Sequence, residues 1–152
     1  MELCKYARHQ IKNIAITTDM IVGFPTETQA DFNETIKNLM KIKFANIHLF
    51  PYSSRPFTVA SKMKNVVSDT EKKLRLIKLS TINQQSVNQY LKKFIGKIVK
   101  IIFEHSKEKG VQLGHSEYSF TVKVKTKYDL NRKCKMVKVT KLTNGQLFGK
   151  LI

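Results

Sequence analysis

One segment near the start of the chain combines a carboxylate, a glycine and a proline in an order that suits a ligand site. Asp19 lies inside a nearly continuous apolar and β-branched run over residues 14–22, and Gly23 and Pro25 end that run. Barrels of alternating strands and helices place ligands at the C-terminal ends of such strands, and glycine lets a ligand approach the backbone closely. A lone carboxylate is expensive to bury. Asp19 therefore either faces a ligand or caps backbone amides, and the residues alone leave both interpretations open.

Alternating lysines near the C-terminus form a second candidate site, for RNA. A period of two places lysines on one face of a strand, while Val122 and Val124 point to the other face. Backbone phosphates would supply most of the affinity, and nearby aromatic rings can stack on unpaired bases. The alternative is a solvated lysine face that keeps an edge strand from aggregating. The candidate RNA-binding residues are Tyr118, Phe120, Lys123, Lys125, Lys127, Lys133, Lys135, Lys138 and Lys141.

The charge of the chain also favours a polyanionic partner. Lys and Arg number 28 against 11 Asp and Glu, which gives a formal net charge of +17. Residues 94–152 carry 13 basic and 4 acidic groups, a higher density of positive charge than the 15 and 7 of residues 1–93. RNA is the expected partner class, and an acidic membrane surface is the second. A genome whose codon bias inflates lysine everywhere is the alternative explanation.

The two cysteines, Cys4 and Cys134, lie far apart and form no metal-binding pair. Free thiols fit a reducing cytosol, and no apolar run approaches the ~20 residues that a membrane span requires. We therefore expect a cytoplasmic chain without a membrane partner. The four histidines show no ligand spacing, and Ser53, Ser54 and Thr58 have no nearby His–Asp partner. The sequence thus predicts no metal ligand and no catalytic residue.

The first half of the chain reads as helix, strand, helix, strand and loop. A helix over residues 2–10 begins without a capping residue, which suggests a start inside a longer gene. The strand over residues 14–22 has the composition of a strand buried on both faces. A helix capped by Thr28 and a strand over residues 45–50 follow, as in a parallel crossover. Because two parallel strands form no stable sheet alone, we expect a truncated domain.

The second half is predicted to be a long helix followed by a small barrel. The helix runs over residues 68–93, with apolar positions that include Leu74, Ile77 and Leu79. Asn144-Gly145 between alternating runs is a strong hairpin signal. Short strands of this kind predict a closed barrel of the OB class. They are expected over residues 97–103, 111–115, 120–125, 134–140 and 146–151.

Three segments resemble the radical S-adenosylmethionine tRNA methylthiotransferase family. Residues 16–35 resemble the fifth barrel strand and the next helix of that family, whose pattern is TTDxIVGFPGETxxDFxET. Residues 48–63 resemble its sixth strand and loop, HxFPYSxRxGTxAxxM, and the FPYS form is most similar to the branch acting on N6-threonylcarbamoyladenosine. Phe94-Ile95-Gly96-Lys97 opens a segment that resembles the TRAM domain, an RNA-binding module.

The resemblance implies a fold of class α/β plus β. Residues 1–67 would be the C-terminal remnant of a partial (β/α) radical S-adenosylmethionine barrel, residues 68–93 a connecting helix, and residues 94–152 a five-stranded OB-like TRAM barrel. The implied function is the C-terminal part of an enzyme that adds a 2-methylthio group to N6-threonylcarbamoyladenosine in tRNA. A stand-alone TRAM-type RNA-binding protein and a non-functional gene remnant are the alternatives.

The family binds [4Fe-4S] clusters, each through three cysteines, and S-adenosylmethionine. Two cysteines cannot supply three thiolates, so the chain is expected to hold no cofactor and to be inactive by itself. Its implied partners are tRNA and an N-terminal polypeptide that carries the cluster domains.

The resemblance also assigns residues to the cofactor pocket. Asp19, Ile21 and Gly23 would face the adenosyl part of the cofactor, and Phe50, Pro51 and Tyr52 would meet its adenine. Two positions depart from the family pattern, since Thr26 and Phe57 stand where it has glycine. Glycine often marks a positive φ. Its loss indicates either a relaxed constraint on the pocket or a loop with a compatible conformation.

Overall fold

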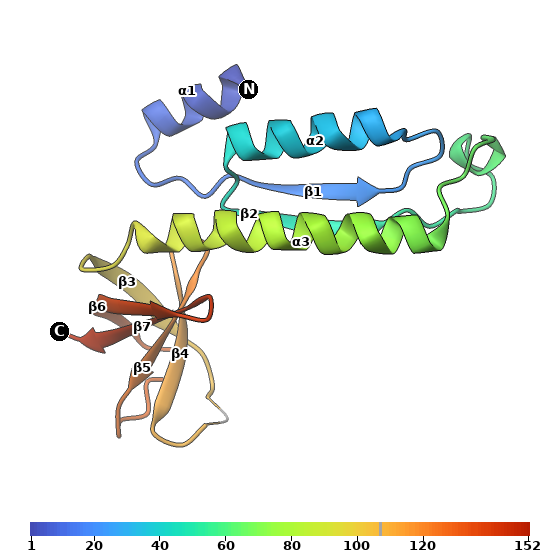
Figure 1. Ribbon diagram of the computed structural model, residues 1–152. Helices are drawn as coiled ribbons and strands as arrows, with labels where there is room; N and C mark the ends of the chain where they lie inside the picture. The colour runs from blue at the N-terminus through green and yellow to red at the C-terminus, as the bar shows by residue number, and fades with distance from the viewer. Residues whose placement is uncertain (107) are drawn as a thin grey trace. The chain divides into compact units, whose positions relative to one another are not determined.

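The computed structural model describes residues 1–106 and 108–152 and divides the chain into two compact units (Figure 1). Unit 1 comprises residues 1–12 and 16–86, and unit 2 comprises residues 13–15 and 87–152. Unit 1 holds α1 (Glu2–Gln10), β1 (Thr17–Val22), α2 (Gln29–Ile42), β2 (Asn46–Pro51), the short 3-10 helix η1 (Ala60–Lys62) and most of α3 (Asp69–Lys92). Unit 2 holds β3 (Ile98–Phe103), β4 (Val111–Ser116), β5 (Thr121–Lys125), β6 (Cys134–Thr143) and β7 (Gln146–Leu151).

Unit 1 is built on a parallel pair of strands joined by a helix, as the sequence predicts. β1 and β2 pair in register, with Ile21 opposite Phe50, and α2 is the crossover between them. The hydroxyl of Thr28 accepts a hydrogen bond from the Asp31 amide, and the Asp31 carboxylate accepts one from the Thr28 amide. This capping box fixes the start of α2.

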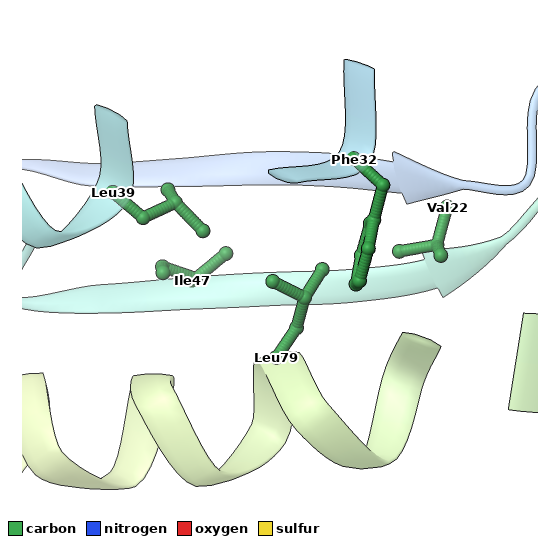
Figure 2. Close-up of a cluster of buried hydrophobic side chains, with 5 residues drawn as sticks. All are labelled: Val22, Phe32, Leu39, Ile47 and Leu79. Atoms are coloured by element: carbon green, nitrogen blue, oxygen red, sulfur yellow. The ribbon is translucent and has the colours of Figure 1, made fainter. Parts of the chain in front are cut away.

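Only one face of the two-stranded sheet is covered. Figure 2 shows the buried cluster on that face, formed by Val22, Phe32, Leu39, Ile47 and Leu79 from two strands and two helices. The alternate residues of β1 lie on the other face, where the Ile21 side chain is 56% exposed. The expectation of a strand buried on both faces from residue 14 is therefore wrong, because β1 begins at Thr17 and has no second layer.

The long helix α3 packs against the sheet with fewer of its apolar residues than the sequence predicts. Its bounds agree closely with the predicted helix, and the Ser68 hydroxyl accepts a hydrogen bond from the Glu71 amide in its first turn. Leu79 is fully buried, whereas Leu74 and Ile77 are 59% and 57% exposed. The prediction that these two belong to the apolar face is wrong, because they point away from the one sheet that α3 covers in unit 1.

Unit 2 is a closed barrel of five strands in the order β3-β4-β5-β7-β6. β5 and β7 pair in parallel, and every other pair is antiparallel. Val122, Val137 and Leu147 are completely buried inside it. A Cβ atom on Gly149 would lie 2.4 Å from Cγ1 of Val137, so this position needs glycine.

The hairpin between β6 and β7 confirms the turn signal in the sequence. Asn144 and Gly145 both have positive φ, at 49° and 76°, as a two-residue turn of type I′ requires. All five predicted strands are present, with bounds that differ by a few residues at most. Within the described residues, no helix is both long enough and apolar enough to cross a membrane.

Candidate functional site

The uncovered face of the β1–β2 sheet forms one side of a cavity of about 500 Å³. Small-molecule sites typically have volumes of ~300–1,000 Å³. The other side is made by the turn after β1 and the loop after β2. The lining residues are Asp19, Ile21, Phe24, Phe50, Pro51, Tyr52, Ser53, Arg55, Thr58 and Ala60. The structure therefore brings five of the six predicted pocket residues together, all except Gly23.

Asp19 lies on the uncovered face of β1, and its side chain is exposed. Its carboxylate receives no hydrogen bond from residues 1–106 or 108–152, while its backbone oxygen accepts one from the Thr18 hydroxyl. The interpretation of Asp19 as a buried cap of backbone amides is therefore wrong. The carboxylate is available to a donor group in the cavity.

Tyr52 gives the cavity an aromatic wall. Its ring meets the Phe24 ring edge-on at a centroid distance of 5.3 Å, and the Lys72 ammonium lies 5.9 Å from its centroid. The Tyr52 hydroxyl is buried and has no hydrogen-bond partner in the part of the chain that the structure describes. An unpaired buried hydroxyl costs free energy. The rings of Phe24 and Tyr52 in the cavity lining suit a planar ligand.

Gly23 serves the packing of the turn and does not line the cavity. Its φ is 74°, and a Cβ atom there would lie 2.4 Å from Cγ of Lys72. The Lys72 side chain fills this space on the way to Asp69, whose carboxylate it meets at 3.1 Å. The glycine is thus explained by the close approach of α3.

The turn after β1 is held by a partly buried ion pair between Glu27 and Arg75 that the sequence reasoning missed. Oε2 of Glu27 accepts hydrogen bonds from the Gly23 amide and from Nη1 of Arg75, each at 2.7 Å. Nε of Arg75 also bonds Glu71 at 2.8 Å, and the Arg75 side chain is only 6% exposed. Burial acts to lower the pKa of Arg75, but its bonds to Glu71 and Glu27 outweigh burial and raise that pKa. Arg75 lies four residues before the buried Leu79 and therefore on the same face of α3. This spacing could have indicated that Arg75 faces the interior of unit 1.

Both positions that depart from the family's glycines have a left-handed backbone. φ is 75° at Thr26 and 67° at Phe57. A β-branched residue is a genuine outlier in this region, so Thr26 is strained. The loops therefore have the conformation that glycine would adopt, while they carry larger side chains.

The basic residues of the barrel form two rows across neighbouring strands. Lys123 on β5 is paired with Phe148 on β7, and Phe148 is paired with Lys141 on β6. Lys138 on β6 lies directly opposite Lys150 on β7. Like charges in directly opposite positions destabilise a sheet, and a bound polyanion would remove that repulsion. Sequence reasoning missed Lys150, although its spacing of two from Phe148 indicates the same face.

The remaining predicted RNA-binding lysines differ in their contacts. Lys125, Lys127 and Lys135 are exposed, and Nζ of Lys133 donates to the Asp129 carbonyl at 3.0 Å.

The two predicted stacking residues lie against the barrel core. Phe120 is 6% exposed, and its ring centroid lies 4.5 Å from that of Phe94. Tyr118 is half-buried against the same ring, at 5.0 Å. Phe120 has no free face for a base, so its expected role in stacking is wrong.

Neither cysteine contributes to a metal site. Cys4 lies in unit 1 and Cys134 in unit 2, and both thiols are free. The described residues contain no group of three or more His, Cys, Asp and Glu side chains suited to a metal ion. The described residues therefore do not fit an iron–sulfur cluster.

The relatives of this chain are tRNA methylthiotransferases, although no protein-family model matches it. It is 33% identical to the tRNA-2-methylthio-N(6)-dimethylallyladenosine synthase of Campylobacter jejuni subsp. doylei over 145 residues, which are 95% of this chain and 34% of that protein. It is 31% identical to the enzyme of that name from Aquifex aeolicus over 152 residues, which are 100% of this chain and 34% of that protein. The threonylcarbamoyladenosine tRNA methylthiotransferase of Thermotoga maritima is 42% identical over 106 residues, which are 70% of this chain and 24% of that protein. The similarity thus extends over the whole chain, which spans about a third of the length of the first two relatives.

Proposed function

We propose that this chain is the C-terminal part of a tRNA methylthiotransferase, in which it binds tRNA and supplies part of the wall of the cofactor pocket. The observation that carries the proposal is the uncovered face of β1 and β2, where Asp19, Ile21 and Phe50 border a cavity of about 500 Å³. A sheet with one bare face and two free edges suits a larger barrel. The relatives are about three times as long as this chain, which also supports the proposal that it is part of a larger enzyme.

In this proposal the pocket residues bind and orient the nucleoside part of S-adenosylmethionine. Phe50 and Tyr52 offer ring surfaces to the adenine, and the Asp19 carboxylate accepts a hydrogen bond from the ligand. When bound next to an iron–sulfur cluster, this cofactor supplies the radical chemistry of such enzymes. The cluster would be held by residues outside this sequence, because the sequence has only two cysteines.

The barrel of residues 94–152 would be the TRAM domain and would hold tRNA by its phosphates. Exposed lysines lie on β5, β6 and β7, and the opposed pair Lys138 and Lys150 favours an anionic partner. The proposed substrate is N6-threonylcarbamoyladenosine in tRNA. The FPYS form of residues 50–53 and the 42% identity to the Thermotoga maritima enzyme support this branch.

Complementation tests this function. The chain is expressed with an upstream polypeptide that carries the cluster domains, in cells without their own methylthiotransferase, and the nucleosides of the purified tRNA are analysed by mass spectrometry. We expect 2-methylthio-N6-threonylcarbamoyladenosine only when both polypeptides are present and none with the chain alone. A 2-methylthio-N6-dimethylallyladenosine product would instead place the chain in the other branch.

A stand-alone RNA-binding protein is the second candidate, and the complete closure of the barrel favours it. All five strands of unit 2 come from residues 98–151, so this unit needs no further strand. Salt-dependent tRNA binding without any methylthiolated product, whatever polypeptide is added, would support this candidate. Absence of binding would contradict both functions and leave a non-functional remnant.

A further inference from the structure

We propose that Phe57 stacks on an unpaired base of bound RNA, from a basic loop at the rim of the cavity. The proposal rests on the proposed tRNA-binding function and adds a contact in unit 1. The loop lies between β2 and α3 and contributes Arg55, Thr58 and Ala60 to the cavity lining. Phe57 lies between two of these lining residues in the chain.

The Phe57 side chain is presented to solvent by a structured turn. It is 101% exposed, although its φ of 67° is unfavourable for a residue with a side chain. The Thr58 hydroxyl donates to the Arg55 carbonyl at 2.9 Å and accepts a hydrogen bond from the Ser61 amide at 3.2 Å. An exposed aromatic ring on a hydrogen-bonded turn is prearranged for a partner outside the unit.

The charges around the ring indicate a nucleic acid. Residues 52–67 carry Arg55, Lys62 and Lys64 and have no Asp or Glu. All three cations are exposed, and none forms an ion pair with residues 1–106 or 108–152. Aromatic rings between cationic side chains are the usual platform for single-stranded nucleic acid, in which bases stack and phosphates pair with the cations.

The cavity provides a reason for a base to lie here. If the cavity takes a nucleoside cofactor, the modified adenosine must reach its rim unpaired, and an enzyme that acts on a base needs it out of the stack. A ring at the rim would hold that base or its neighbour. A protein partner would instead need an apolar pocket for Phe57, and its contact would not depend on bases.

The test measures RNA affinity with the full chain and two hairpin RNAs of the same stem. One has an unpaired adenine-rich loop and the other an abasic loop of the same length. Phe57→Ala is expected to weaken binding of the adenine-rich hairpin by roughly 5- to 100-fold, the usual loss per stacked base, and to leave the abasic hairpin unaffected. Val59→Ala is the matched control, because Val59 is 77% exposed in the same loop, and it should change neither affinity.

A fluorescent variant reports the stacking directly. The chain has no tryptophan, so Phe57→Trp introduces a single tryptophan, whose selectively excited fluorescence should be quenched by the adenine-rich hairpin and not by the abasic one. Phe57→Leu keeps an apolar side chain without a ring and should bind as weakly as Phe57→Ala.

Three results would overturn the proposal. One is that Phe57→Leu binds as tightly as the parent chain, and another is that Phe57→Ala weakens both hairpins equally. The third is unchanged binding by Phe57→Ala while Lys138→Gln weakens it, which would leave the proposed tRNA-binding function intact. If the parent chain bound neither hairpin nor tRNA, the proposed function would fail together with this contact.

Discussion

Nη1 of Arg75 on α3 lies 2.7 Å from Oε2 of Glu27, in the turn that follows β1. The same oxygen accepts the Gly23 amide, so one carboxylate joins the end of a strand to a helix that begins more than forty residues later. Phe24, which borders the cavity, lies in this turn. The wall of the cavity therefore depends on a contact that is distant in sequence.

Arg75→Met should destabilise unit 1 by about 3 kcal/mol, because it leaves the partly buried carboxylate of Glu27 without its cationic partner. Hydrogen exchange of the β1 and α2 amides in urea measures this loss within unit 1. Lys73→Met is the matched control, since Lys73 is exposed on the same helix. Equal exchange in the two variants would show that the ion pair contributes nothing.

Thr26→Gly should stabilise unit 1 by about 1 kcal/mol, because glycine adopts the φ of 75° without strain. The gain is reduced by the greater freedom of glycine in the unfolded chain. Thr26→Ala retains the Cβ atom and should therefore show little of this gain in stability. A loss of stability in the glycine variant, measured by urea unfolding, would contradict strain at this position.

Tyr90 should make unit 2 less stable in strong alkali. Its hydroxyl donates to the carbonyl oxygens of Asn13 and Tyr118, at 2.9 and 3.0 Å. Burial, followed by the charge of Tyr118, raises the pKa of Tyr90 from 10.0 to about 12. The folded chain thus favours the neutral phenol. The stabilisation is complete below the unfolded pKa of 10.0 and is lost as pH rises towards the folded pKa of about 12.

Unfolding free energies across this range check the effect of Tyr90. The phenylalanine of Tyr90→Phe cannot ionise. This variant should therefore lack the part of the alkaline loss of stability that is due to Tyr90, although it is less stable than the parent chain at neutral pH. Tyr128→Phe is the control, because Tyr128 is 62% exposed. Parallel declines in all three chains would rule out this contribution.

Lys138→Gln and Lys150→Gln should each weaken tRNA binding and reduce the slope of log affinity against log salt by about 1. Without RNA, either change should slightly stabilise the barrel, because it removes a repulsion between directly opposite charges. Lys41→Gln on the exposed end of α2 is the control. An unchanged salt slope in both variants would exclude this row from the RNA surface.

Local patterns predict most of the secondary structure, apart from the start of β1 at Thr17. Thr28 and Asp31 carry the complete signal of a capping box, and Asn144-Gly145 carries that of a type I′ turn. The barrel strands followed from alternation, because Val122 and Val124 alternate with lysines on one strand. These features involve neighbours within a few residues, so the sequence displays them directly.

Long-range pairing was harder to predict. The apolar run over residues 14–22 has the composition of a strand with two covered faces, but nothing in it shows whether a second layer is present. The role of Glu27 depends on Arg75, and that of Gly23 on Lys72. Phe120 was assigned to the RNA surface because aromatic residues serve both stacking and cores, and only the contact with Phe94 separates these roles.

The position of β7 between β5 and β6 makes the barrel sensitive to truncation of the chain. β7 is the last strand of the chain, and it pairs with a different neighbour on each side. A premature stop codon before Gln146 would therefore leave two unpaired strand edges and uncover Val122 and Val137. Such edges promote aggregation, so we expect the shortened product to aggregate.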